Sequence, residues 1–296
     1  MRPVIRFRLP YKERGVRLIG DPHIDHPGHA RELLIRDLED CKKCGDIGIV
    51  MGDVWSMILP QDRKRFNSGK YGEKVDAIIN RKLDEAEELF APYADCLDVF
   101  MVGNHESAVI RFHAVDPVAL LIDRLNRVKK SGALESGRIA HGGYTCWVQL
   151  LFDAKLGPRD TSDRSSVSNS MWLHHGAGGA APVTKGMIDG NRIKQGRLAD
   201  VYAIAHKHTQ IADTDRFEYL DGYGNIKRIV RDYLVVAGYS GCDDEEYPDE
   251  DGYVIDWSTE KFYNLEAQGS VKIIFKPCHK FRENVIERTI IRESAA

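Results

Sequence analysis

The 296-residue sequence has no long hydrophobic run. No stretch approaches the roughly 18 to 20 consecutive apolar residues that a membrane-spanning helix needs. The segment Met1–Pro10 carries Arg2, Arg6 and Arg8 and has no apolar core of the length that a secretory signal requires. We therefore expect a cytoplasmic protein without a membrane partner.

Cysteine is scarce as well, with six residues at positions 41, 44, 96, 146, 242 and 278. So few and so widely spread, they exclude a disulfide-dense secreted scaffold and favour reduced thiols. Cys41 and Cys44 have the spacing of zinc ligands, but the sequence has no second pair of cysteines, or of a cysteine and a histidine, that would complete the site. A structural zinc ion needs four ligands, so a surface or packing role is the simpler interpretation.

The chain also lacks an excess of positive charge. Its formal net charge is -3 and its isoelectric point is near 6.4. Such a chain has no overall field that would hold polyanionic nucleic acid, so any contact with nucleic acid must come from local patches.

What is present is the composition of a globular protein, with 43% hydrophobic and 29% charged residues. Short apolar runs alternate with amphipathic stretches, as in proteins whose strands are joined by helices that pack on a sheet. The clearest helical spacing lies in Tyr71–Phe90, and a second helix should open at Asp116 with Pro117 as its first residue. The predicted strands are Val16–Gly20, Ile47–Gly52, Leu97–Gly103, Tyr144–Leu150, Ser170–His174 and Asp200–Ala205.

The pattern changes after Ala205 to that of hairpins. Arg216–Leu220 and Ile226–Ala237 flank a turn at Asp221–Asn225, and Val271–Phe275 follows later, which predicts a second sheet. We expect surface loops at Pro158–Asn169 and in the acidic stretch Asp243–Asp251. The length leaves one or two domains open; we favour a single domain over residues 1–296, with a core at about 14–240 and C-terminal strands and an extension at 241–296.

Metal-binding side chains follow five of the predicted strands. Ligands in open α/β sheets gather at the carboxyl ends of the strands, so these segments could converge on one crevice. Any one of these residues alone would usually be an ordinary turn residue, whereas five such segments together predict a metal centre. The residues are Asp21 and His23, Asp53, Asn104 with His105, His175, and His206 with His208.

The segments Gly20-Asp21-Pro22-His23, Gly52-Asp53, Gly103-Asn104-His105-Glu106, His175-Gly176 and Ala205-His206-Lys207-His208 resemble, in this order, the motif series of the calcineurin-like metallophosphoesterases. The one departure is Ala205, which stands where that family usually has glycine. The resemblance spans residues 20 to 208 and implies a four-layer α/β/β/α sandwich of two mixed sheets flanked by helices.

The same resemblance implies a binuclear centre. It places one divalent cation on Asp21, His23, Asp53 and His208, and a second on Asp53, Asn104, His175 and His206, with Asp53 bridging. Imidazole, carboxylate and amide ligands without thiolate suit manganese, which we favour, and iron, zinc or nickel as alternatives. His174 is the alternative to His175, because neighbouring residues of a strand point to opposite sides.

The implied activity is phosphoester hydrolysis, in which a hydroxide bridging the two metals attacks the phosphorus atom. His105, next to Asn104 and claimed by neither metal, resembles the family's catalytic imidazole and would protonate the leaving group. The sequence does not identify the partner that orients His105. The stretch after Asp53 lacks the Asp and Arg-Gly of the protein serine/threonine phosphatases, which argues against that branch.

The substrate is less well defined. The segment from Gly52 to Trp55, with Pro60 further on, resembles the repair-exonuclease branch and favours a phosphodiesterase, with DNA or a nucleotide as a candidate substrate. A phosphomonoesterase or nucleotidase, and a non-catalytic metal-binding scaffold, are the alternatives. The oligomeric state stays open. Candidate phosphate contacts are Arg63, Lys64, Arg65, Lys185 and Arg192.

Overall fold

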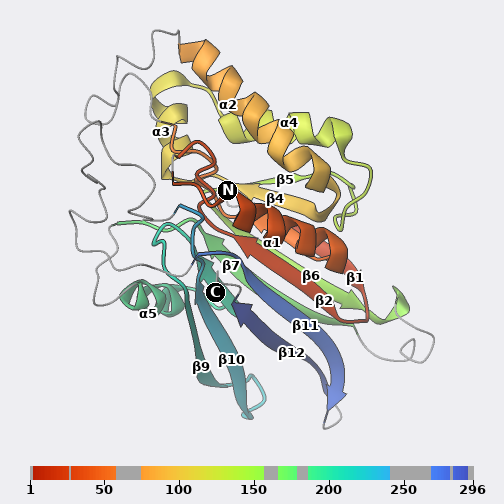
Figure 1. Ribbon diagram of the computed structural model, residues 1–296. Helices are drawn as coiled ribbons and strands as arrows, with labels where there is room; N and C mark the ends of the chain where they lie inside the picture. The colour runs from red at the N-terminus through yellow and green to blue at the C-terminus, as the bar shows by residue number, and fades with distance from the viewer. Residues whose placement is uncertain are drawn as a thin grey trace.

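The computed structural model describes residues 3–26, 28–57, 75–156, 166–178, 186–240, 268–280 and 283–292. Two mixed sheets of six strands each lie face to face, and helices cover their outer sides (Figure 1). The α/β sandwich predicted from the sequence is therefore confirmed.

One sheet has the strand order β12-β11-β2-β3-β4-β5. Its three neighbouring pairs from β2 to β5 are parallel, while β11 runs antiparallel to both β2 and β12. The strands are β2 (Arg14–Ile19), β3 (Ile47–Val50), β4 (Leu97–Met101), β5 (Ala140–Gly143), β11 (Val271–Lys280) and β12 (Glu283–Arg292). Strands β3 and β4 are buried along their whole length, as expected for apolar runs covered on both faces.

The other sheet has the order β1-β6-β7-β8-β10-β9. Strand β8 runs parallel to both β7 and β10, and β9 pairs with β10 as an antiparallel hairpin. The strands are β1 (Val4–Pro10), β6 (Thr145–Asp153), β7 (Val167–His174), β8 (Val201–Ile204), β9 (Ile211–Leu220) and β10 (Ile226–Val235).

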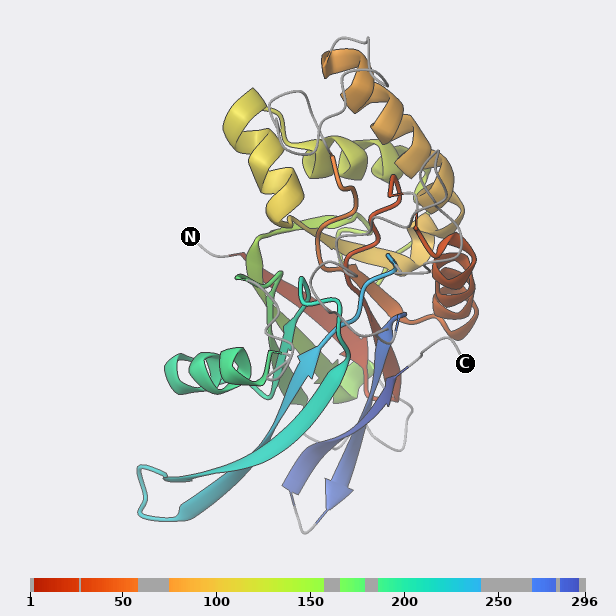
Figure 2. The same ribbon diagram turned by 60° about the vertical axis from the view of Figure 1, so that its left-hand side comes forward.

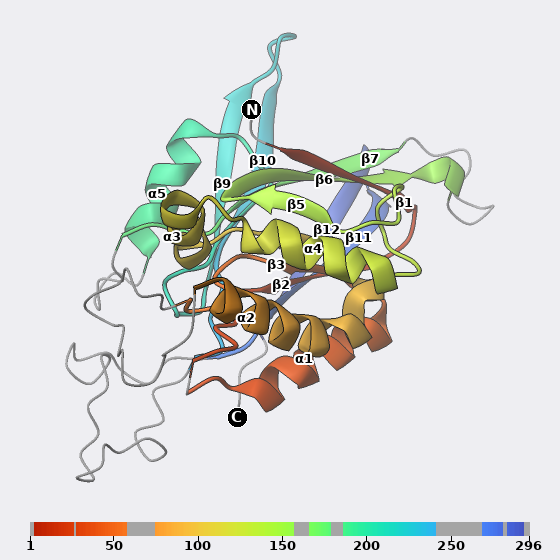
Figure 3. The same ribbon diagram turned by 90° about the horizontal axis from the view of Figure 1, so that it is seen from above.

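The helices form the two outer layers. Helices α1 (Arg31–Cys44), α2 (Val75–Phe90), α3 (Asn104–His113) and α4 (Pro117–Val128) pack on the first sheet, and α5 (Met187–Gly196) packs on the second. Figure 3 shows α1, α2 and α4 along one side of β2 and β3. Short 3-10 turns at Ala91–Cys96 and Ala154–Leu156 complete the described elements. No helix in the described ranges is long and apolar enough to cross a membrane.

The main core lies between the two sheets. Strand β1 shows why, because its side chains alternate strictly and bury Ile5, Phe7 and Leu9 while their neighbours face outward. The inward side chains of β2 and β6, such as Leu18 and Leu150, belong to the same cluster. This layer fixes the two sheets against each other, so loops at the ends of their strands keep a set spacing.

Each predicted strand overlaps an observed one, although β9 begins five residues before Arg216 and β11 continues five residues beyond Phe275, and β1, β5 and β12 were not predicted. The strands expected to form a second sheet divide between the two sheets, because β11 pairs with β2 whereas β10 pairs with β8. For Pro158–Asn169 we expected a loop. The last part of this range is strand, since β7 begins at Val167, where side chains alternate between the core and the outer face. Residues 158–165, like the acidic stretch 243–251 and the first turn of the predicted helix at 71–74, lie outside the described residues. The turn at Asp221–Asn225 is confirmed by two backbone hydrogen bonds that close it.

Three helices escaped the sequence analysis, namely α1, α3 and α5. Helix α1 buries Leu33, Leu34, Leu38 and Cys41, but these apolar residues are diluted by charges on the exposed side. It ends at Gly45, whose φ of 66° is the left-handed conformation that glycine adopts without strain. Helix α3 begins directly at Asn104, inside a motif that we interpreted only as chemistry.

Helix α4 begins as predicted, with Asp116 as N-cap and Pro117 in the first turn. The Asp116 carboxylate accepts hydrogen bonds from the Ala119 amide at 3.0 Å and from His141 Nε2 at 3.1 Å. Partial burial disfavours the charge of this carboxylate, but the bond from His141 and those from backbone amides outweigh burial and lower its pKa.

We expect Asp116→Ala to lower the free energy of unfolding by about 1 kcal/mol at neutral pH, because the cap is lost. Asp116→Asn keeps an acceptor oxygen and should lose less. Because the folded-state pKa is lowered, the stabilisation by the charged form is present above about pH 4 and disappears as the pH falls through the folded-state pKa. Urea unfolding of the three proteins at several pH values tests this, and an Ala variant as stable as the parent at neutral pH would contradict it.

Candidate metal centre

The structure brings the predicted metal-binding residues together at one end of the sandwich. They lie on loops that follow the carboxyl ends of β2, β3 and β4 in one sheet and of β7 and β8 in the other. Groups of carboxylate and imidazole atoms there lie within 4.8 Å of one another. The residues in these groups are Asp21, His23, Asp53, His105, His175, His206 and His208, and Asn104 contacts His175 directly.

The backbone of these loops is strained where it presents the side chains. Seven residues other than glycine have positive φ in the described part of the chain, and five of them belong to this cluster. Such conformations are unfavourable for side chains with a Cβ atom and concentrate at functional sites. The five are Asp21 (40°), His23 (44°), Asp53 (48°), His206 (67°) and His208 (49°).

Glycines in the motifs let the loops approach closely. A Cβ atom on Gly103 would lie 2.0 Å from Asp53 Oδ1, and one on Gly52 would lie 2.6 Å from the Gly103 nitrogen. Gly52 also has a φ of 99°, which residues with a side chain rarely adopt. The Gly-Asp and Gly-Asn-His segments are therefore in mutual contact, and the glycines are what the contact requires.

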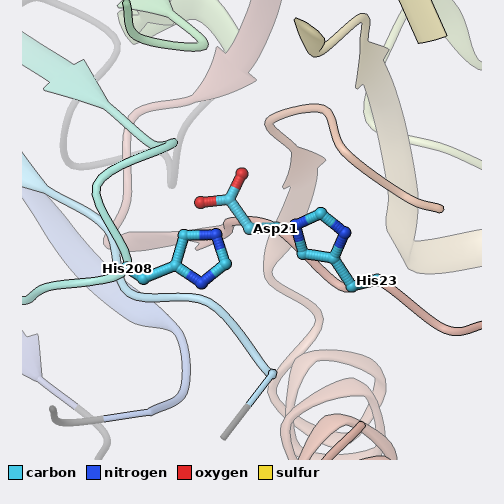
Figure 4. A group of neighbouring side chains, drawn as sticks. All are labelled: Asp21, His23 and His208. Atoms are coloured by element: carbon cyan, nitrogen blue, oxygen red, sulfur yellow. The ribbon is translucent and has the colours of Figure 1, made fainter. Parts of the chain in front are cut away.

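Asp21, His23 and His208 form the first group, and Figure 4 shows the two rings on either side of the carboxylate. Asp21 is fully buried, and its Oδ2 accepts a hydrogen bond of 2.7 Å from the His206 amide. Its Oδ1 is buried without a hydrogen-bond partner among the described residues. Burial raises the pKa of Asp21 to about 8. A cation beside Oδ1 would satisfy this atom and stabilise the charged form.

The two histidines of this group are suited to metal binding. Burial lowers the pKa of His208 to about 4 and that of His23 well below its ordinary value, so both rings are neutral at pH 7. His23 Nδ1 lies 3.1 Å from Ser56 Oγ, and His208 Nδ1 lies 3.1 Å from Ser240 Oγ. With Nδ1 engaged in each ring, Nε2 is the nitrogen left for a ligand.

The side chains of Asp53, His175 and Asn104 are in contact in the second group. A neutral His175 could not donate a hydrogen bond to either of the other two. His175 Nδ1 lies 3.0 Å from the Met51 carbonyl oxygen and so donates its proton there. Its Nε2 then lies 3.1 Å from Asp53 Oδ2 and 3.0 Å from Asn104 Oδ1. All three atoms are acceptors when the imidazole is neutral. The two distances of about 3 Å from His175 Nε2 are those between adjacent ligand atoms around one octahedral cation with bonds of about 2.1 Å.

Without a cation, a proton must occupy this position. Burial alone would lower the pKa of His175, but the carboxylates of Asp53 and Asp21 outweigh burial and raise it to about 9. Burial would raise the pKa of Asp53, but the imidazoles around it, first that of His175, hold it below its ordinary value. The site therefore attracts positive charge, whether a proton or a metal ion.

His206 links the two groups. Its amide donates to Asp21, while its Nε2 lies 3.0 Å from the Gly178 carbonyl oxygen, so Nδ1 is the nitrogen free to bind a ligand. Burial, with the neighbouring His175, lowers its pKa, which keeps this ring neutral too. The cluster therefore offers acceptor atoms throughout and fits divalent cations.

His105 has the partner that the sequence left unidentified. Its Nδ1 lies 2.6 Å from the backbone carbonyl oxygen of Ser56, which makes Nδ1 the donor. Its backbone amide donates to Asp53 Oδ1 at 2.9 Å, and its Nε2 lies 3.9 Å from Asp53 Oδ2. The ring is thus held at the edge of the cluster with Nε2 facing it, and the side chain is 16% exposed, compared with 0 to 6% for Asp53, His175 and His23.

Two acidic residues that we had not singled out hold these loops in place. Asp25 accepts from the amides of Ser56 at 2.6 Å and Met57 at 3.2 Å, and so fixes the carbonyl that orients His105. Glu106 is buried and accepts from the amides of Asp53, Trp55 and Gly103 at 2.8 to 3.2 Å. The signal for Glu106 was its place three residues after Gly103, as in a capping box.

His174 points away from the cluster, as strand alternation predicts. Its Nδ1 accepts a hydrogen bond of 2.8 Å from the Gly176 amide, and its ring stacks on Trp172 at 5.3 Å. His175 and not His174 therefore lies beside Asp53.

The predicted phosphate contacts stay a prediction, because most of them fall on residues that the structure does not describe. Arg63, Lys64, Arg65 and Lys185 lie outside the described residues. Arg192 is exposed on α5. The lysine that does approach is Lys207, which is buried and donates to the Ala177 and Gly178 carbonyl oxygens at 2.6 and 3.1 Å. It braces the loop after β7.

A further group of possible ligands, Asp40, Cys44 and Asp46, lies near the start of β2. Its charges are already balanced, because Arg17 pairs with both carboxylates and Lys272 lies 3.0 Å from Asp46. Five cysteines of the described residues, Cys44 among them, are free thiols.

No protein-family model matches the sequence, and no curated protein matches it either. What is known of the site is therefore its geometry: buried histidines and carboxylates that could hold metal ions, on strained loops from two sheets.

Proposed function

We propose that this protein is a binuclear, metal-dependent phosphoester hydrolase, with a phosphodiester as the substrate. The observation that carries the proposal is the position of His175 Nε2, which lies 3.1 Å from Asp53 Oδ2 and 3.0 Å from Asn104 Oδ1 within a buried cluster of imidazoles and carboxylates. The ordered resemblance of the motifs to the calcineurin-like metallophosphoesterases supports the reaction class.

The two groups of ligands suggest two cations. Asp21, His23 and His208 would hold one, and Asn104, His175 and His206 the other. Asp53 lies beside His23 and beside His175, with its Oδ2 3.9 and 3.1 Å from their Nε2 atoms, so one carboxylate can serve both. Oxygen and imidazole ligands suit manganese, iron or zinc, and we propose manganese first.

Divalent cations bound there would supply Lewis acidity, neutralising phosphoryl oxygens and acidifying a water molecule for attack. The chain's own contribution to leaving-group departure is His105. Because its Nδ1–H is bound to the Ser56 carbonyl, its Nε2 is the atom that can carry and deliver a proton at the cluster. Asp25 holds the Ser56 amide and thereby the position of that carbonyl.

The charges around the cluster favour a diester. A phosphodiester carries one negative charge, whereas a monoester carries up to two and gains more from arginine or lysine clamps. Lys207, which lies between His206 and His208, is engaged by the Ala177 and Gly178 carbonyl oxygens and by Asp189, so its charge is already partly balanced. Trp55, part of the segment that resembles repair exonucleases, is buried and donates to the Lys82 carbonyl, so its role is to hold helix α2.

The first prediction concerns metal binding. Adding Mn²⁺ to protein treated with a chelator should raise the melting temperature by about 5 °C or more, because cations bind the folded state and stabilise its buried carboxylates. Asp53→Asn removes the shared negative charge and should abolish most of the shift. Arg192→Ala, on the exposed face of α5, is the matched control and should behave like the parent. An unchanged shift in Asp53→Asn would contradict the assignment.

The second prediction separates proton transfer from metal binding. His105→Ala should lower kcat by about 10²- to 10⁴-fold, as expected for loss of a general acid, and retain the Mn²⁺-induced melting shift. His113→Ala removes an imidazole from the other end of the same helix and should keep full activity. A His105→Ala protein with parental kcat on every substrate would show that the proton donor is another group.

The third prediction concerns the substrate. With Mn²⁺, kcat/KM should be higher by about tenfold or more for bis(p-nitrophenyl) phosphate than for p-nitrophenyl phosphate. Single- and double-stranded DNA should be tested beside them, with Asp53→Asn as the blank. The reverse preference would indicate a phosphomonoesterase. Metal binding without turnover of any substrate would indicate a binding scaffold.

A further inference from the structure

The hairpin formed by β9 and β10 leaves the body of the protein, and Figure 2 shows its tip extending away from helices α1 to α4. It concentrates exposed apolar side chains, with six of the fifteen large hydrophobic residues that are exposed in the described part of the chain. These are Phe217 (39% exposed), Tyr219 (41%), Leu220 (67%), Tyr223 (93%), Ile226 (64%) and Val230 (44%). Phe217 and Tyr219 stack on one face of the hairpin with ring centroids 6.4 Å apart.

Strand β9 is also the last strand of its sheet. It pairs with β10 on one side, and no described strand lies on the other. The unpaired amides and carbonyls of such an edge are a template for another strand, and proteins usually blunt or cover it. The outer half of this edge, from Arg216 to Leu220, is exposed at every residue.

The hydrogen-bond pattern shows which residues of β9 offer their backbone to this free edge. The ladder pairs Leu220 with Ile226, and the next pair is closed by the hydrogen bond from the Asp221 amide to the Asn225 carbonyl. Bonded and non-bonded pairs alternate in an antiparallel ladder, so odd-numbered residues of β9 bond toward β10. Even-numbered residues, including Arg216 and Glu218, therefore direct their amides and carbonyls outward.

We propose that the free edge of β9 pairs with β9 of a second copy of this chain, in an antiparallel arrangement about a twofold axis at Phe217. In this register Arg216 of each copy lies opposite Glu218 of the other, and both are outward-bonding residues, as the ladder requires. The registers one step to either side would place Arg216 opposite Arg216 or Glu218 opposite Glu218. Like charges in directly opposed positions are unfavourable, so charge selects the register centred on Phe217.

Charge also argues for a second copy and against a polyanion such as nucleic acid. The hairpin has four cationic residues, Arg216, Lys227, Arg228 and Arg231, and five acidic ones, Asp213, Asp215, Glu218, Asp221 and Asp232. A surface with both signs nearly balanced is suited to a copy of itself. Across the axis, a row Arg228–Glu218–Arg216 would extend the ion pair of 2.7 Å that Arg228 and Glu218 already form.

The apolar side chains fit the same arrangement. Phe217 of one copy would lie opposite Phe217 of the other on the face that also carries Tyr219. Four aromatic rings would then gather around the axis, within reach of one another across directly opposed and diagonal positions. The interface is small, so we expect association that depends on concentration.

A pair of cysteine variants tests the axis. In a non-hydrogen-bonded antiparallel pair the Cα atoms are about 4.5 Å apart, which a disulfide can span. Phe217→Cys should therefore give a disulfide-linked dimer under mild oxidation on a non-reducing gel. Tyr219→Cys is the matched control, because its opposite residue would be Asp215 and not itself. Both variants should carry Cys44→Ser, since Cys44 is exposed. Equal cross-linking of the two variants, or none in either, would overturn the proposal.

A charge exchange tests the register. The full-length parent should approach twice its monomer mass by sedimentation as its concentration rises to about 100 µM. Arg216→Glu and Glu218→Arg should each weaken self-association by about tenfold or more, because each creates two like-charge pairs. An equimolar mixture of the two variants should associate again, because every pair across the axis then has opposite charges.

Lys276→Glu is the control for surface charge, since Lys276 pairs with Glu287 in the other hairpin and should leave the dimer intact. A parent that stays monomeric, or variants that dimerise as well as the parent, would exclude pairing through β9. Failure here would leave the metal-binding and activity experiments unaffected, because the hairpin holds none of the cluster residues.

Discussion

The burial of negative charge among imidazoles is the constraint on which the site depends. Asp21, Asp53 and Glu106 are all buried at one end of the sandwich, and burial raises the pKa of Asp21 and of Glu106 to about 8. Glu106 is stabilised by three backbone amides, whereas Asp21 Oδ1 has no hydrogen-bond partner among the described residues and Asp53 Oδ2 lies 3.1 Å from the buried imidazole of His175. A bound cation would supply the positive charge that these buried carboxylates lack. The strained backbone at Asp21 and Asp53 indicates that the arrangement serves binding or catalysis and not stability.

The two-sheet architecture makes this arrangement possible. Parallel strands β2, β3 and β4 direct their carboxyl ends to the same side as β7 and β8 of the facing sheet, so ligands from both sheets meet across the core. The segment after β10 also supports the cluster. The Tyr239 amide donates a hydrogen bond to the Asp21 carbonyl oxygen, and Ser240 Oγ contacts His208 Nδ1. Because these contacts cross between layers, the site depends on the packing of the whole sandwich and not on any one loop.

The cluster residues could be predicted from the sequence because they follow apolar runs that predict strands. The carboxyl ends of the strands in an α/β sheet are where ligands usually bind. The contacts that orient the cluster residues could not be predicted. The partner of His105 is the carbonyl of Ser56, and backbone atoms carry no signature of residue type. The role of Asp25 could not be predicted for the same reason, because its carboxylate accepts hydrogen bonds from two backbone amides. Helix α1 was missed because the charged residues on its exposed face interrupt the helical spacing of its apolar residues. The burial of Lys207 could not be predicted, because it depends on contact with the loop after β7, which is distant in the sequence.

The cluster and the hairpin are interpreted by the same physical rule. Polar groups that a fold leaves without a hydrogen-bond or charge partner indicate what else can bind there. At the cluster these are buried carboxylate oxygens, among them Asp21 Oδ1, which lacks a hydrogen-bond donor among the described residues and which a cation would stabilise. At β9 they are outward backbone groups beside exposed aromatic rings and balanced charges, which calls for another strand of the same kind. Strand β10 joins the two regions, since one end forms the hairpin and the other leads into the segment that supports Asp21 and His208. A second copy bound at β9 would therefore contact the hairpin and none of the cluster residues.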